Sequence, residues 1–134
     1  MKENIKHLVC FDFDGTLDKP SVQKFAQDLL LSGYDVYITT QRQNNKLAPS
    51  LSWNDDLFEI SDSIGIKRKN IIFCNLESKY KIIKDIDFIF HLDDSFTEIK
   101  LLKEHTNIKP VCVFGNKYWK YECQKILDKK INWK

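Results

Sequence analysis

The chain has 134 residues, 43% of them hydrophobic, which suffices for one globular domain and leaves little room for a second. Its 21 Lys and Arg residues nearly balance its 19 Asp and Glu residues, and the net charge of +2 excludes a field strong enough to indicate a nucleic-acid or membrane partner by itself. Residues 1–134 are therefore predicted to form a single domain.

The first third of the chain alternates between strand-like and helix-like periods. Residues 5–12 and 35–40 are short apolar runs that end in polar or acidic residues, as buried parallel strands do. Between these runs, Ser21 is expected to cap a helix that ends at Gly33. The predicted apolar face of that helix is Val22, Phe25, Ala26, Leu29 and Leu30.

The middle of the chain continues the alternation. A polar loop at residues 41–52 precedes a helix predicted to start at Asn54 and to stop at Gly65. Residues 71–74 and 88–90 read as two further buried strands, and residues 78–84 read as a short helix between them.

The last third contains one more strand and two more helices. Ser95 and Glu98 have the spacing of a capping box, which predicts a helix that starts at Ser95. Residues 111–114 are the fifth apolar run, and residues 117–130 are expected to form the closing helix. Five strands with helices between them predict an α/β three-layer sandwich with a five-stranded parallel, Rossmann-like sheet.

Polar side chains follow the carboxyl ends of four predicted strands, where parallel sheets place their ligand sites. Carboxylates gathered there would repel each other by about 4 kcal/mol per pair at 4 Å and an effective dielectric constant near 20. A cation is therefore expected among them, and a site of few carboxylates suits Mg²⁺. The residues concerned are Asp12 and Asp14, Thr39 and Thr40, Asn75, and Asp93 and Asp94.

Residues 11–17, Phe-Asp-Phe-Asp-Gly-Thr-Leu, resemble the first motif of the haloacid dehalogenase (HAD) superfamily, a hydrophobic strand that ends in D-x-D-G-T-L/V. In that family a Ser or Thr follows the second strand, a Lys comes next, and an acidic pair follows the fourth strand. The resemblance covers residues 8–98. The corresponding residues here are Thr39 or Thr40, Lys79, and Asp93 with Asp94.

The resemblance implies a Mg²⁺-dependent phosphomonoester hydrolase, a HAD-type phosphatase that works through an aspartyl-phosphate. Asp12 would attack phosphorus, and Asp14 would protonate the leaving oxygen and then activate water. Mg²⁺ would be held by the Asp12 carboxylate, the Asp14 carbonyl and the Asp94 carboxylate, with Asp93 as the other acid of the fourth motif.

Four side chains are candidates to bind the substrate phosphate. Lys79 would contact the phosphate and the nucleophile, with a solvated surface lysine as the alternative and Lys81 as the second candidate. The Thr-x-Arg spacing of Thr40 and Arg42 favours Thr40 over Thr39, and the Arg42 fork could then hold a substrate anion.

Three other residues have two readings each. Glu98 is either part of the metal shell or a member of the capping box with Ser95. His91, within a predicted strand, is expected to be a hydrogen-bonded structural residue rather than a general base. Trp53 could stack on a base or sugar, but its distance from Phe58 favours a hydrophobic staple at the start of a helix.

The spacing of the motifs leaves no room for a cap domain, so the site is expected to be open unless residues 41–53 or a second subunit cover it. Resemblance to members of the family that lack a cap implies a bulky phosphate, such as a nucleotide or a nucleic-acid end. Residues 117–134 interleave lysines with aromatic residues, which suits nucleic acid, although an amphipathic helix packed on the sheet is the favoured interpretation.

The rival function is a HAD-like domain without catalysis, which binds phosphate or another protein. The four cysteines are far apart, and three of them lie in apolar runs, so we predict reduced thiols rather than a zinc site or disulfides. The residues before the first strand are few and polar and no stretch is long enough for a membrane span, so we expect a cytoplasmic protein without a membrane partner.

Overall fold

The computed structural model describes residues 7–44 and 52–131. Its strands are β1 (Leu8–Phe11), β2 (Asp35–Thr40), β3 (Ile71–Phe73), β4 (Phe88–Asp93) and β5 (Lys109–Cys112). They form a five-stranded, all-parallel sheet in the order β3-β2-β1-β4-β5. The strand order reverses between β1 and β4, so the switch point of the sheet lies at the carboxyl ends of these two strands.

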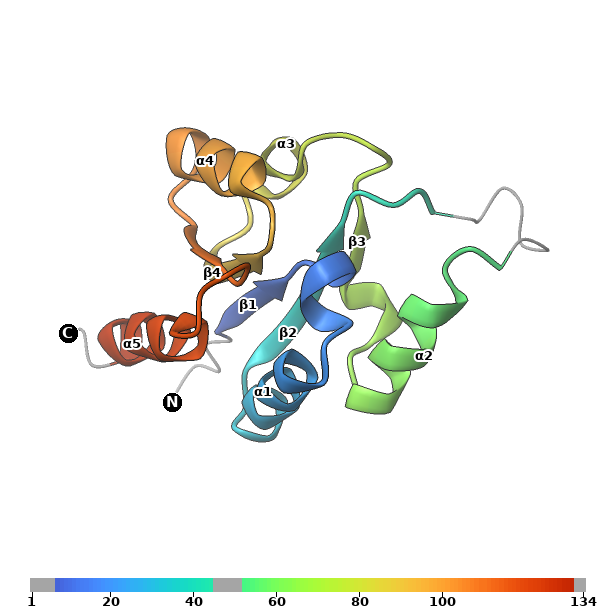
Figure 1. Ribbon diagram of the computed structural model, residues 1–134, viewed down its shortest axis with the longest axis horizontal. Coiled ribbons are helices and arrows are strands. Elements are labelled where there is room, and N and C mark those ends of the chain that lie inside the picture. The colour runs from blue at the N-terminus through green and yellow to red at the C-terminus, as the bar shows by residue number, and fades with distance from the viewer. Residues whose placement is uncertain (1–6, 45–51, 132–134) are drawn as a thin grey trace, which may run out of the picture.

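Helices cover both faces of the sheet (Figure 1). One face carries α1 (Pro20–Leu31), α2 (Asp55–Ile64) and α5 (Trp119–Ile131), and the other carries α3 (Lys79–Ile83) and α4 (Phe96–His105). Because side chains alternate along a strand, Phe11 joins the first core, whereas Cys10 joins the second with Ile83 and Leu102. The predicted α/β sandwich is confirmed.

Several element boundaries differ from the prediction, and two of these differences have a clear physical reason. Lys19 occupies the capping position of α1 and Pro20 its first turn, so the expected cap at Ser21 is wrong. Proline suits the first helical position because its φ is already helical and its missing N–H needs no partner there. The fifth strand includes Pro110 and ends at Cys112, earlier than predicted; β5 is an edge strand, where a missing N–H is tolerated.

The four cysteines are free in this structure. Cys10, Cys74 and Cys123 are buried and Cys112 is partly buried. Burial raises the pKa of Cys74 to about 11, which keeps that thiol neutral. No helix among the described residues is both long and apolar enough to cross a membrane.

Candidate active site

Asp12 is held at the switch point by its neighbours along the chain and in the sheet. Its backbone N–H donates to the Leu92 carbonyl of β4 at 2.8 Å, and its own carbonyl accepts from Leu17 N at 3.1 Å. The latter bond closes an irregular helical turn, η1 (Phe13–Leu17), from which the Thr16 hydroxyl donates to Asp12 Oδ2 at 3.1 Å. The Asp12 side chain is thus both buried and oriented.

Lys79 supplies the cation that separates the two buried acids. It is the first residue of α3, is 2% exposed, and extends its ammonium to within 2.6 Å of Asp12 Oδ1 and 2.7 Å of Asp93 Oδ2. The surface-lysine alternative is therefore wrong. Lys81 is the exposed one, and it pairs with Glu77 at 3.4 Å.

Asp93 has partners for both of its carboxylate oxygens. Oδ2 contacts Lys79 and also lies 2.8 Å from His91 Nε2, and Oδ1 accepts from Ser95 N at 3.1 Å. His91 is completely buried and in contact with Asp93, in agreement with its predicted structural role. Its other ring nitrogen, Nδ1, has no partner among the described residues.

Glu98 combines one predicted contact with one unpredicted contact. Its backbone N–H donates to Ser95 Oγ at 3.3 Å, as the capping box requires. Its carboxylate does not return to Ser95, however, but accepts from Lys79 N at 2.9 Å. That half of the predicted capping box is wrong, because Glu98 instead satisfies a free backbone donor at the start of α3 and so fixes the position of Lys79.

The two carboxylates of this cluster differ in proton affinity. Burial, together with the charge of Asp93, raises the pKa of Asp12 to about 8 against the opposing influence of Lys79. Burial also disfavours ionised Asp93, but His91 and Lys79 outweigh it and hold the pKa of Asp93 below its usual range. His91 and Lys79 together therefore keep Asp93 ionised, whereas burial makes Asp12 hold its proton more tightly than an ordinary carboxyl does.

This raised pKa predicts a pH-dependent stability. Between pH 4 and pH 8, roughly, folded Asp12 holds a proton that the unfolded chain has released. Its contribution to the free energy of unfolding should therefore fall as pH rises, by at most about 1.4 kcal/mol per pH unit. Urea unfolding of wild type and Asp12→Asn without divalent metal tests this. The stability of wild type relative to the variant should decline with pH, and a constant difference would contradict it.

Three carboxylates could hold a metal ion. Oxygens of Asp12, Asp93 and Asp94 all lie within 4.8 Å of one another. Both oxygens of Asp12 and of Asp93 have donors within the protein, whereas Asp94 is partly exposed, so Asp94 is the ligand most open to an ion. A site built on a few carboxylates is compatible with Mg²⁺.

Gly15 leaves space for the Asp94 carboxylate. Its φ of +80° lies in the left-handed region, and a Cβ added there would collide with Asp94 Oδ2. Gly15→Ala should therefore displace Asp94 and weaken Mg²⁺ binding at least about tenfold, as measured by calorimetry. Gly33→Ala is the matched control, because Gly33 has a φ of +97° but nothing within 4 Å of an added Cβ. Equal Mg²⁺ affinity in the two variants would contradict the role of Asp94.

Asp14 lies outside the buried cluster and is held by Arg42. Arg42 Nε and Nη2 donate to its carboxylate at 2.9 and 2.7 Å, and Nη1 and Nη2 donate to Asp56 at 2.8 and 3.0 Å. Nη1 also donates to the Trp53 carbonyl at 3.2 Å, so the guanidinium is fully used within the protein. Arg42 would have to exchange one carboxylate for a substrate phosphate to fulfil its predicted role.

The two candidate threonines point to different partners. Thr39 Oγ1 lies 2.6 Å from Cys10 Sγ, on the sheet face that α3 and α4 cover. Thr40 Oγ1 accepts from Arg42 N at 3.1 Å at the end of β2, which leaves its hydroxyl proton for another acceptor. Of the two, Thr40 has the hydroxyl better placed for an anion at the sheet edge.

Two further contacts of the site were not predicted. Asp56, in the first turn of α2, shares Arg42 with Asp14. The hydroxyl of Thr16 was part of the motif but had no assigned role. The Trp53 ring is half exposed, and its predicted staple contact with Phe58 stays a prediction; residues 45–51 of the predicted covering loop lie outside the described residues.

The fold and the site together define an α/β protein with a buried acid–lysine–acid cluster at the switch point of a parallel sheet. No protein-family model matches the chain, and no curated protein matches it either.

Proposed function

We propose that the protein is a Mg²⁺-dependent phosphomonoester hydrolase of the HAD type that forms an aspartyl-phosphate on Asp12. The observation that supports this best is the buried cluster of Asp12, Lys79 and Asp93, with Asp94 beside it. Burying such a cluster is costly and stabilises a fold poorly, whereas charged groups with perturbed pKa values gather at functional sites. The resemblance of residues 11–17 to the first HAD motif points to the same chemistry.

The reaction would proceed in two displacements at phosphorus. An Asp12 oxygen attacks the phosphate, the bond to the leaving alkoxide breaks, and Asp14 gives that oxygen a proton. Water then attacks the same phosphorus and gives a proton to Asp14, and inorganic phosphate leaves while Asp12 returns as a carboxylate. Mg²⁺ bound by Asp12 and Asp94 would neutralise charge on the phosphate oxygens.

The remaining residues would orient the reacting groups and neutralise their charge. Lys79 would compensate the charge of the nucleophile and of the incoming phosphate, and Thr40 would donate its hydroxyl proton to a phosphate oxygen. Arg42 would position Asp14, since its fork fixes both oxygens of that carboxylate.

The test is a panel of sugar, nucleotide, amino-acid and nucleic-acid phosphomonoesters assayed with Mg²⁺ and with chelator. Release of phosphate that depends on Mg²⁺, and tight binding of beryllium fluoride in competition with substrate, are the expected results. The absence of turnover on the whole panel together with no binding of beryllium fluoride would sink the proposal. Phosphate binding without turnover would favour the rival, an inactive phosphate-binding module.

A further inference from the structure

Three exposed aromatic rings lie beyond the carboxyl ends of β4 and β5. Phe96, Phe114 and Tyr118 are 66%, 61% and 59% exposed, although rings of this size usually bury most of their surface. Phe96 begins α4 only two residues after Asp94, and its ring packs against that of Phe114 with centroids 6.1 Å apart. We call these three residues the aromatic platform; Phe96 joins it to Asp94 of the candidate active site, and Tyr118 follows Phe114 by four residues along the chain.

Hydrogen bonds fix the segment that carries Phe114 and Tyr118. Val113 N donates to the Asp93 carbonyl at 2.9 Å, which ties the segment to the end of β4. Asn116 Nδ2 donates to the Cys112 carbonyl at 2.8 Å, and Asn116 Oδ1 accepts from Tyr118 N at 3.0 Å. The aromatic rings are therefore presented to solvent by an ordered turn.

A hollow of about 590 Å³ continues the platform toward α1. Lys19 and Ser21 form one wall, and Lys117 and Tyr118 form the other. Lys117 Nζ lies 5.3 Å from the centroid of the Tyr118 ring, and neither lysine forms an ion pair within the described ranges. Lys19 N donates to the carbonyl of Thr16, whose hydroxyl contacts Asp12, so one wall of the hollow is joined to the site.

We propose that this surface selects the substrate, and that the phosphomonoester bears a nucleobase. Base rings would stack on the aromatic platform while the scissile phosphate reaches Asp12, and Lys19 and Lys117 would attract the negative charge of the same molecule. Aromatic faces beside cations without an ion pair match a base joined to phosphate, because a planar base covers an aromatic ring more fully than a sugar does. This inference rests on the proposed phosphatase function. A mononucleotide and the end of a single-stranded oligonucleotide share the required chemistry.

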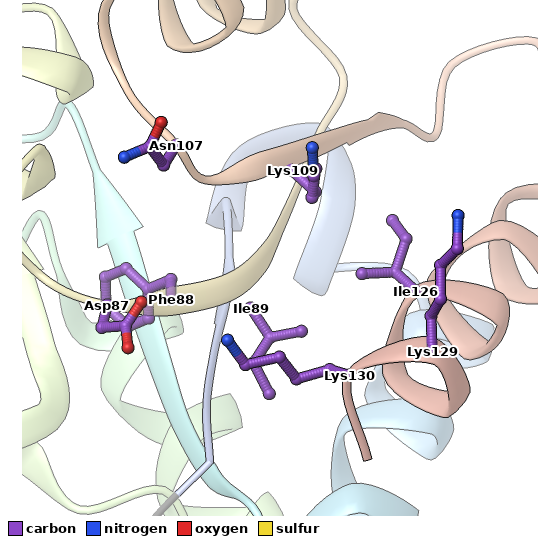
Figure 2. Close-up of a pocket in the computed structure, with 8 residues that line it drawn as sticks. All are labelled: Asp87, Phe88, Ile89, Asn107, Lys109, Ile126, Lys129 and Lys130. Atoms are coloured by element: carbon purple, nitrogen blue, oxygen red, sulfur yellow. The ribbon is translucent and has the colours of Figure 1, made fainter. Parts of the chain in front are cut away.

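The lysines near the end of α5 take no part in this surface. Lys129 and Lys130 line a groove with Lys109, at the amino ends of β4 and β5 (Figure 2). All strands are parallel, so that groove lies at the sheet edge opposite Asp12. The lysines of residues 117–130 are thus divided between the two edges of the sheet. Lys117 lies at the edge of the candidate active site, and Lys129 and Lys130 lie at the opposite edge.

The experiment compares wild type with Phe96→Ala/Phe114→Ala on ribose 5-phosphate, on a nucleoside 5′-monophosphate, and on a short oligothymidylate with a terminal phosphate. Stacking should make kcat/KM of wild type about 5- to 150-fold higher for a base-bearing ester than for ribose 5-phosphate. The double variant should lose this preference, mainly through KM, and keep its rate on ribose 5-phosphate. Leu31→Ala, which truncates an even more exposed apolar side chain at the end of α1, should keep the preference.

Binding measurements distinguish a mononucleotide from an oligonucleotide, and they distinguish this inference from the proposed phosphatase function. The affinity of a fluorescent oligothymidylate phosphate for wild type should fall with salt, and Lys19→Gln/Lys117→Gln should reduce the slope of log affinity against log salt by about 1.4. A mononucleotide preferred over the oligonucleotide, with a flat salt response, would confine the substrate to nucleotides. Turnover without preference for a base would overturn this inference but not the phosphatase. Base-dependent binding without any turnover would overturn the phosphatase proposal but not the binding of a base by this surface. If wild type were a dimer and Phe96→Ala/Phe114→Ala a monomer, a second copy of the chain would cover the platform, and this inference would be overturned.

Discussion

Asp12→Asn should abolish phosphatase activity and leave the fold intact. The amide cannot serve as the nucleophile, so kcat/KM on the best substrate is expected to fall by at least about 10⁴-fold. The fold should persist because an amide has nearly the shape of the protonated carboxyl, and burial raises the pKa of Asp12 to about 8. Lys79 would keep Asp93 as its partner at 2.7 Å.

Two companion variants make this result specific. Asp28→Asn is the matched control: Asp28 lies on α1, is partly exposed and, among the residues that the structure describes, forms an ion pair only with Lys24 at 2.9 Å, so the activity of this variant should equal that of wild type. Asp14→Asn should lose about 10²- to 10⁴-fold, the usual range for general acid–base catalysis, yet still accept phosphate from a substrate with a good leaving group. The decisive measurement is covalent labelling by such a substrate. Activity of Asp12→Asn within tenfold of wild type, or labelling of that variant, would exclude Asp12 as the nucleophile.

The convergence of the acids was predictable because it follows from the topology. Apolar runs that end in acids predict parallel strands, and parallel strands bring their carboxyl ends to one edge. That argument needs no long-range information, and it places Asp12 near Asp93 and Asp94. It also predicts a cation among them. It does not say which one, and in this structure the Lys79 ammonium occupies the place between Asp12 and Asp93.

Most of the side-chain contacts that escaped prediction join residues far apart in the chain; the hydrogen bond from Thr16 to Asp12 is a local one. Ser95 and Glu98 match a local capping pattern, but the carboxylate of Glu98 is drawn to Lys79 N, 19 residues away. Arg42 was expected to bind a substrate anion. Its guanidinium instead donates to Asp14 and Asp56, which lie 28 and 14 residues away along the chain. Local patterns predict which groups need partners. Only the packing of α3 against α4, or of α2 beside β2, decides which partner is closest.

Lys79→Met should destabilise the protein more than any other single change at this site. Removing the ammonium leaves Asp12 and Asp93 facing each other with 8% and 1% of their side chains exposed. Breaking a buried ion pair in this way typically costs about 3–5 kcal/mol, because the remaining charge is desolvated and uncompensated. The loss should be greatest at pH 8, where Asp12 begins to ionise, and smaller at pH 5, where Asp12 is protonated and only Asp93 loses a charged partner. Urea unfolding at both pH values measures it.

Two further variants show whether the cost comes from the unpaired acids. Lys81→Met removes an exposed lysine of the same helix, 3.4 Å from Glu77, and should change the free energy of unfolding by less than about 0.5 kcal/mol. Lys79→Met/Asp12→Asn removes one acid along with the cation, so the double variant should regain part of the stability that Lys79→Met loses at pH 8. The loss of free energy of unfolding in the double variant could instead equal the sum of the losses in the two single variants. Lys79 and Asp12 would then not be coupled, and Lys79 would not compensate the charge of Asp12.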